Sequence, residues 1–233
     1  MISHKYKCIF IHIPRTGGSS IELAIKGRVW WTGNLQEKHM SASETRKYYG
    51  EKIWNNYFKF SFVRNPWDRI ISLWKSQLYT KKCSLYNFLL NFRPAEHEYF
   101  SSNYCDILNE ELDFIGYFEN LQNDFEKICN QINLNKMKLP HFNQTKRKPY
   151  YIYYDDRTKS IVSYLYKNDI EHFNYNFDLS ENSINNNYHK KKLTKYILVF
   201  KIFRIFHEMD RKIIFFSKKI KNYFKKWIKK YQQ

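Results

Sequence analysis

The chain has 233 residues, of which 43% are hydrophobic and 19% aromatic, a composition that excludes wholesale disorder and allows one domain plus an appendage. The net charge of +18 is unevenly placed, because residues 190–233 hold 15 Lys and Arg against Glu208 and Asp210, a net of +13, which leaves +5 for residues 1–189. The first part therefore suits a small anionic ligand, and the basic end suits anionic lipid, nucleic acid or polyanionic glycan.

The cysteines and the first residues indicate the compartment. Four cysteines, with no C-x-x-C pair and no histidine at metal-ligand spacing, favour reduced thiols and no metal site. A disulfide between Cys83 and Cys105 is the less favoured alternative. Residues 1–7 lack the apolar core of a signal peptide, and no apolar run approaches the roughly 20 residues that span a bilayer. We therefore expect a cytoplasmic protein.

The first predicted strand covers residues 8–13 (CIFIHI) and leads through a loop into a helix around residues 21–26. The loop consists of Pro14, Arg15, Thr16, Gly17, Gly18, Ser19 and Ser20. Such a turn aims backbone N–H groups and the positive helix end at one point, and its arginine and hydroxyls add donors, so it suits a phosphate. The Walker pattern G-x-x-x-x-G-K-[ST] is absent, which disfavours ordinary ATP or GTP hydrolysis. A plain Gly-Gly turn with surface hydroxyls is the alternative.

A second strand–helix junction follows. Ser41-x-x-Glu44 resembles a capping box and predicts that a helix starts there. The alternating run YFKFSFV, residues 57–63, predicts the second strand. Asparagine followed by proline, Asn65-Pro66, is typical of an N-cap and the first helical position, so the next helix is expected to begin at this point.

This second junction also carries phosphate-binding side chains. Arg64 falls at the carboxyl end of the strand, where open parallel sheets bind ligands. Asn65, Arg69 and Ser72 are spaced so that they share one face of the helix. We therefore expect Arg64, Arg69 and Ser72 to hold a second phosphate group. An ion pair of Arg69 with Asp68 or with a surface carboxylate is the alternative.

The remaining elements complete an alternating pattern. We expect loop and short helix at 80–112, where acceptor specificity is set, a third strand at 113–117, helices at 121–132 and 157–173, and a basic aromatic loop at 139–154. Strands that alternate with helices predict an α/β fold of three layers around a central parallel sheet.

A polar stretch separates the basic end from the rest. We place a domain at 1–180, a polar linker at 181–189 and a basic tail at 190–233. From Tyr196 onward, apolar residues recur at a spacing near 3.5 residues, which predicts an amphipathic helix on the anionic inner surface of the membrane. Packing of the tail on the domain or on a partner chain, and polyanion binding, are the alternatives, and no specific nucleic acid is expected.

Together, residues 14–20 and 60–72 closely resemble the sulfotransferases that use 3′-phosphoadenosine-5′-phosphosulfate (PAPS), specifically the carbohydrate-modifying branch. In that family the loop P-[KR]-T-G-[GS]-[TS]-S grips the 5′-phosphosulfate, and the segment V-R-N-P-x-x-R-x-x-S grips the 3′-phosphate. Lys38-His39-Met40 also looks like the family, and the resemblance spans roughly residues 5–178. The tail has no counterpart in the family pattern.

The resemblance implies a P-loop-type fold and in-line transfer of the sulfuryl group from PAPS to a hydroxyl, which we expect to be on a carbohydrate. Arg15 stands where lysine is common, so it is expected to stabilise the leaving phosphate as a fixed charge and not as a proton donor. Lys146 and Arg147 are expected to close over the nucleotide, with a solvated basic loop as the alternative. The chemistry requires no metal.

The resemblance places a histidine at position 39, and a histidine suits proton abstraction from the acceptor at neutral pH. His39 is therefore the expected general base, with a surface histidine as the alternative, while Glu22 and Glu44 are weaker candidates and His12 is expected to be structural. Two other functions stay open. One is a phosphotransferase of the P-loop kinase kind, and the other is a non-catalytic protein that binds membrane or polyanions through its tail.

Overall fold

The computed structural model describes residues 1–29, 35–76, 83–91, 103–140, 147–177, 197–198, 200 and 201. The chain divides into two compact units, Met1–Ser183 and Ile184–Gln233. The predicted linker lies outside the described residues, as does the predicted tail apart from four positions.

Four strands form one sheet in the order β1-β2-β3-β4, and they are β1 (Ile2–Ser3), β2 (Cys8–Ile11), β3 (Phe58–Val63) and β4 (Phe114–Tyr117). β2, β3 and β4 are parallel, in a register that aligns Phe10 with Phe60 and Phe60 with Phe114. β1 is antiparallel to β2, so the prediction of a wholly parallel sheet is wrong at this edge. The cause is a tight turn between them, in which Lys7 adopts a φ of 46°.

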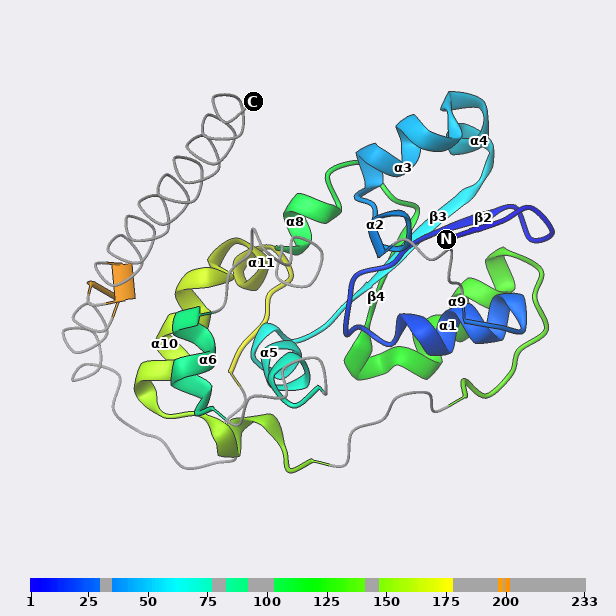
Figure 1. Ribbon diagram of the computed structural model, residues 1–233. Coiled ribbons are helices and arrows are strands. Elements are labelled where there is room, and N and C mark those ends of the chain that lie inside the picture. The colour runs from blue at the N-terminus through cyan, green and yellow to red at the C-terminus, as the bar shows by residue number, and fades with distance from the viewer. Residues whose placement is uncertain are drawn as a thin grey trace, which may run out of the picture. The chain divides into compact units, whose positions relative to one another are not determined.

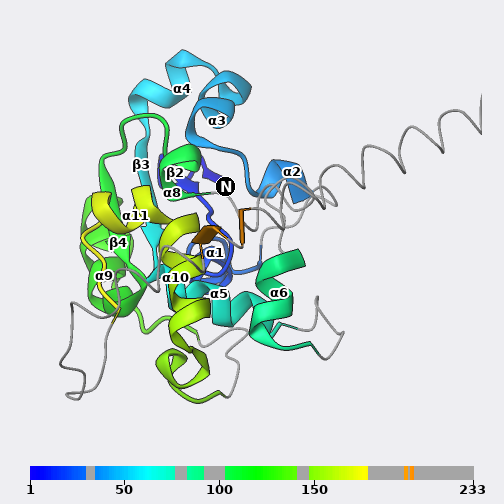
Figure 2. The same ribbon diagram turned by 90° about the vertical axis from the view of Figure 1, so that its left-hand side faces the viewer.

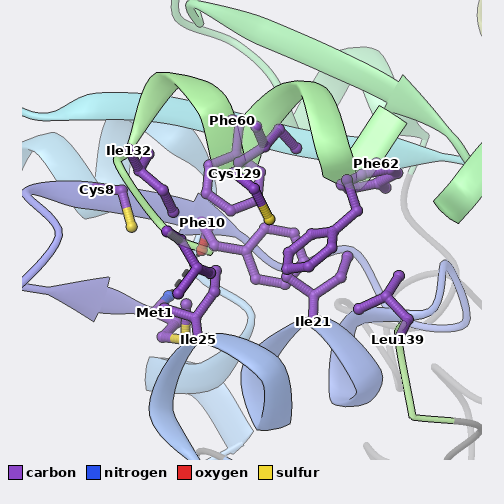
Figure 3. Close-up of a cluster of buried hydrophobic side chains, with 13 residues drawn as sticks. Met1, Cys8, Phe10, Ile21, Ile25, Phe60, Phe62, Cys129, Ile132 and Leu139 are labelled. Atoms are coloured by element: carbon purple, nitrogen blue, oxygen red, sulfur yellow. Dashed lines mark hydrogen bonds between the residues drawn. The ribbon is translucent and has the colours of Figure 1, made fainter. Parts of the chain in front are cut away.

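One face of the sheet packs against α1 (Gly18–Lys26) and α9 (Leu121–Gln131). Figure 3 shows Phe10 and Phe60 of the strands meeting Ile21 of α1 and Cys129 of α9 in one buried cluster. Strand side chains alternate between the two faces, which explains why every second residue of β2 belongs to this cluster. Full burial of one such aliphatic or aromatic side chain contributes about 1.5–3 kcal/mol.

The opposite face is covered by α3 (Ala42–Tyr49), α4 (Glu51–Asn56) and α8 (Tyr104–Ile107) (Figure 1). Here Ile9 and Ile11 of β2 contact a second buried cluster that includes Trp54 of α4. Helices thus lie on both faces of a mostly parallel sheet. This arrangement confirms the mixed α/β class that the alternating pattern predicted.

A third group of helices gathers around α10, which contacts the other three members (Figure 2). The group is α5 (Pro66–Trp74), α6 (Leu85–Asn91), α10 (Asp156–Leu165) and α11 (Lys167–His172). The single helix predicted at 157–173 is therefore wrong, because the helical backbone is interrupted at Tyr166, which has a φ of −113° and a buried ring. Three short turns complete the unit: α2 (Leu35–Lys38), η3 (Phe118–Asn120) and η4 (Tyr150–Tyr153).

Both predicted helix starts are confirmed. The Ser41 side chain accepts a hydrogen bond from the Glu44 amide, and the Glu44 carboxylate accepts one from the Ser41 amide. Asn65 caps α5 by accepting from two amides of its first turn, with proline at the first position. All four cysteines are free thiols, so the alternative of a Cys83–Cys105 disulfide is wrong. Within the described ranges, no helix combines the length and apolar composition needed to cross a bilayer.

Candidate functional site

The site lies at the carboxyl ends of β2 and β3, where the chain passes into α1 and α5 (Figures 1 and 2). Because the two strands are parallel neighbours, their following loops emerge at the same edge of the sheet. The first loop contains Arg15 and the second contains Arg64. Glu119, which follows β4 in η3, also lies here, and its carboxylate accepts a hydrogen bond of 2.7 Å from the Asn65 amide.

The glycines of the first loop are required by its geometry. Gly17 has a φ of 86°, a conformation that L side chains rarely adopt. Gly18 lies directly against His12, and a Cβ added there would be 2.1 Å from Nε2 of the His12 ring. Gly17 caps α1 without a side-chain hydrogen bond, whereas α3, α5 and α10 each have a side-chain cap. Helix starts that lack a side-chain cap are common positions for anion binding in proteins.

The second motif is hydrogen-bonded directly to the first loop. Arg15 Nε donates to Ser72 Oγ at 2.9 Å, and Arg64 Nη1 donates to the Arg15 carbonyl at 2.8 Å. Arg69 Nε donates to the Pro14 carbonyl at 3.2 Å. Arg15 has a φ of 71°, and such a conformation in a residue with a side chain costs on the order of 1–3 kcal/mol. The contacts from Arg64 and from α5 hold this strained loop in place.

Three arginines of the site are close enough to perturb one another. Burial, and then the charges of Arg64 and Arg147, lower the pKa of Arg15. Burial likewise lowers the pKa of Arg64, with Asp68 opposing this shift and Arg147 adding to it. Arginine side chains remain charged in proteins at physiological pH. Among the described residues, Asp68 is the one carboxylate that hydrogen-bonds to these guanidinium groups, so the cluster carries an excess of positive charge.

Two of the predicted phosphate ligands lie below the site surface. Arg69 is fully buried, and its guanidinium carbon lies 4.8 Å from the Tyr104 ring centre and 5.9 Å from that of Tyr166. Thr16 is also fully buried, and its hydroxyl donates to the Ile13 carbonyl at 2.8 Å. Both side chains therefore support the loop from beneath. The alternative pair of Arg69 with Asp68 is replaced by pairs of Asp68 with Arg64 and Arg147.

Three further predicted ligands, Ser20, Ser72 and Arg147, are largely buried. Ser72 is buried against Arg15, and Ser20 lies within the first turn of α1, where its amide donates to the Gly17 carbonyl at 3.0 Å. Arg147 is brought to the site from the basic loop by its contact with Asp68. Lys146 lies outside the described residues.

A second polar cluster adjoins the loop at Gly18. His39 Nδ1 donates to the His12 carbonyl at 2.8 Å, and the two imidazole rings have centres 4.6 Å apart. Burial, and then the neighbouring His12, lower the pKa of His39 to about 3. His39 is therefore neutral, and the hydrogen bond at Nδ1 leaves the lone pair on Nε2. This is the protonation state that a general base requires.

Glu22, which the sequence offers as a weaker candidate for the base, is the centre of that cluster. Its buried carboxylate accepts from His12 Nδ1 at 2.6 Å and from Lys38 Nζ at 3.0 Å. Burial raises the pKa of Glu22, but the bonds from His12 and Lys38 outweigh burial and the net shift is downward. A charged Glu22 thus orients both side chains. Glu44, by contrast, serves as the capping residue of α3. No sequence motif links these residues, since they come from three separate elements.

The comparison with known families decides the class of protein. The Sulfotransferase family matches residues 1–176, a range that includes both motifs and Arg147. The chain belongs to the sulfotransferase family. This sulfotransferase is also 36% identical to an uncharacterized protein of Archaeoglobus fulgidus over 108 residues, which is 41% of this chain and 83% of that protein. No solved structure matches it. Sulfuryl transfer to a hydroxyl-bearing acceptor is the general activity of the family.

In the part of the chain that the structure describes, no group of three or more His, Cys, Asp or Glu side chains could hold a metal ion.

Proposed function

We propose that this sulfotransferase uses PAPS as donor and transfers its sulfuryl group to a hydroxyl of a carbohydrate. The observation that supports the proposal best is the cluster of Arg15, Arg64 and Arg147, in which Asp68 is the one carboxylate among the described residues that bonds to a guanidinium group, and it bonds to Arg64 and Arg147. A donor with phosphate groups at both ends of its ribose supplies the anions that such a cluster lacks. The proposal is further supported by the direct hydrogen bonds between the two motifs, from Arg15 to Ser72 and from Arg64 to the Arg15 carbonyl.

In this proposal the two motifs hold opposite ends of the donor. Arg15 and the first amides of α1 bind the 5′-phosphosulfate, where negative charge grows as the bond from sulfur to the phosphate oxygen breaks. Arg64, Ser72 and Arg147 bind the 3′-phosphate and orient the donor for in-line attack. Arg69 contributes by holding the Pro14 carbonyl and so the shape of the loop.

The acceptor hydroxyl loses its proton as its oxygen bonds to sulfur, and His39 is the proposed base. The hydrogen bond from Nδ1 to the His12 carbonyl fixes the ring, so that Nε2 accepts the proton. A pKa of about 3 makes His39 a weak base in the unliganded protein. Binding of a polyanionic donor nearby raises the pKa of a histidine, which brings its basicity closer to neutral pH. Glu22 is the second candidate for the base, and it is tied to His12 and Lys38.

Two measurements test the proposal. Adenosine 3′,5′-bisphosphate, the expected nucleotide product, should raise the melting temperature, whereas ATP with Mg²⁺ should not. The reverse result would favour a kinase-like phosphotransferase. A transfer screen with radiolabelled sulfate donor across glycans, lipids and small phenols then identifies the acceptor, and label on phenols alone would reject the carbohydrate assignment.

The proposed base has its own test. His39→Ala should abolish transfer and leave affinity for adenosine 3′,5′-bisphosphate within about twofold, because His39 bonds to the His12 carbonyl and its ring lies against the His12 ring. Retained turnover in His39→Ala would instead indicate Glu22 as the general base.

A further inference from the structure

Asp68 bridges two arginines that come from distant parts of the chain. Its Oδ2 accepts from Arg64 Nε at 2.8 Å and from Arg64 Nη2 at 2.6 Å. Its Oδ1 accepts from Nη2 of Arg147, 79 positions along the sequence. All three side chains are largely buried, at 8–15% exposure. Charge-assisted pairs of this kind are stronger and more directional than exposed ones.

The two arginines differ in how firmly the fold holds them. Arg64 is held by four contacts. Its guanidinium group donates to Asp68 and to the Arg15 carbonyl, and the guanidinium carbon lies 3.8 Å from the centre of the Phe118 ring. The backbone carbonyl of Arg64 accepts a hydrogen bond of 2.5 Å from the Tyr104 hydroxyl. Arg147 lies in an irregular segment before η4. Among the described residues, its one hydrogen-bonded partner is Asp68.

Asp68 lies in a firmly held part of the fold. It lies in the first turn of α5, next to Asn65, which caps that helix. The Asn65 side chain also donates to the Asn176 carbonyl at 3.0 Å, and its amide donates to Glu119. A carboxylate in this first turn of α5 places Arg147 beside Arg64 although the two cations repel each other.

We propose that Asp68 is a positioning residue of the nucleotide site, which holds Arg147 beside Arg64 before the nucleotide arrives. This inference rests on the proposed function, since it concerns the same anion site. The bridge leaves donors for a phosphate: Arg64 has five N–H groups, and three of them are used within the described residues. The nucleotide therefore binds without displacing Asp68, and the ordering of Arg147 is completed in advance.

Charge alone predicts the opposite effect, which makes the inference testable. Asp68→Asn removes a negative charge beside an anion site, and on charge alone it would tighten nucleotide binding. If Asp68 acts by positioning, Asp68→Asn instead weakens binding, because the amide cannot accept from both guanidinium groups. We expect a loss of about tenfold, the usual effect of having to immobilise one long side chain on binding.

The experiment measures the affinity for adenosine 3′,5′-bisphosphate by calorimetry in the full chain. The variants are Asp68→Asn, Arg147→Ala, the double variant and Asp68→Glu, with Asp113→Asn as matched control. Asp113 also pairs with a cation, Lys59 at 2.9 Å, but it precedes β4 and so lies at the opposite edge of the sheet. We expect Asp68→Asn and Arg147→Ala each to weaken binding, and the double variant to bind no more weakly than the weaker-binding of these two. Asp68→Glu should recover part of the lost affinity. The control, Asp113→Asn, should bind as wild type.

Several results would overturn the inference. It fails if Asp68→Asn binds as tightly as wild type or more tightly, or if its effect adds fully to that of Arg147→Ala. Should Asp68→Asn not fold, unchanged affinity in Arg147→Ala is enough to reject it. A wild-type protein that does not bind adenosine 3′,5′-bisphosphate rejects the proposed function as well, so the two failures are distinguishable.

Discussion

Replacing Gly18 by alanine tests whether the loop and the buried histidine cluster form one unit. The new Cβ would lie 2.1 Å from Nε2 and 2.2 Å from Cδ2 of His12, well inside van der Waals contact. The ring cannot simply move away, because Nδ1 is bonded to buried Glu22 at 2.6 Å. Overpacking costs about 1–3 kcal/mol, and loss of a hydrogen bond to a charged group costs about 1.5–3 kcal/mol.

The expected destabilisation of Gly18→Ala is therefore about 3–5 kcal/mol, which corresponds to a fall in melting temperature of roughly 6–20 °C for a unit of this size. Gly27→Ala is the matched control. Gly27 has a φ of 69°, and no heavy atom lies within 4 Å of a Cβ added there. The substitution should therefore destabilise the protein by backbone strain alone, about 1 kcal/mol. Denaturant unfolding measures the change in the free energy of unfolding for both variants.

A double variant identifies the cause. His12→Ala removes the ring that the alanine would strike, so Gly18→Ala in that background should cost less than about 1 kcal/mol further. The reasoning is refuted if Gly18→Ala unfolds like wild type, or if its cost is the same with and without the His12 ring.

Three further predictions concern Arg64, His39 and the basic tail. Arg64→Ala removes charge-assisted donors and should weaken adenosine 3′,5′-bisphosphate binding about 10- to 100-fold by calorimetry; an unchanged affinity would exclude Arg64 from the anion site. Burial lowers the pKa of His39 to about 3 from an unfolded value near 6.5, so the unfolded chain binds more protons between these values. The melting temperature should accordingly rise from pH 4 to 7 and level off above pH 7, with a shallower rise in His39→Gln, and equal slopes would contradict the shift. Removal of residues 190–233 should preserve nucleotide affinity and reduce co-sedimentation with anionic vesicles, and undiminished co-sedimentation would reject the membrane role of the tail.

Signals between near neighbours in the chain determined the parts of the fold that were predicted correctly. The Ser41 capping box and the Asn65-Pro66 helix start depend on side chains that bond to backbone within three residues, so their geometry is encoded locally. The strands at 8–11 and 58–63 follow from their apolar runs. The order of these elements was sufficient to predict an α/β class and to place both loops at strand ends.

Contacts between distant residues determined what the sequence did not reveal. Arg69 has the spacing of a ligand, yet it is buried between Tyr104 and the break at Tyr166. No local pattern reports that contact.

The two clusters of the site depend on tertiary structure in the same way. Glu22 gains its role from His12 and Lys38, and Asp68 from Arg147, across separations of 10 to 79 residues. A charged side chain in the sequence indicates only that a partner is needed once it is buried, because burial without one is costly. Which partner it meets is decided when the strands align and bring their loops to one edge.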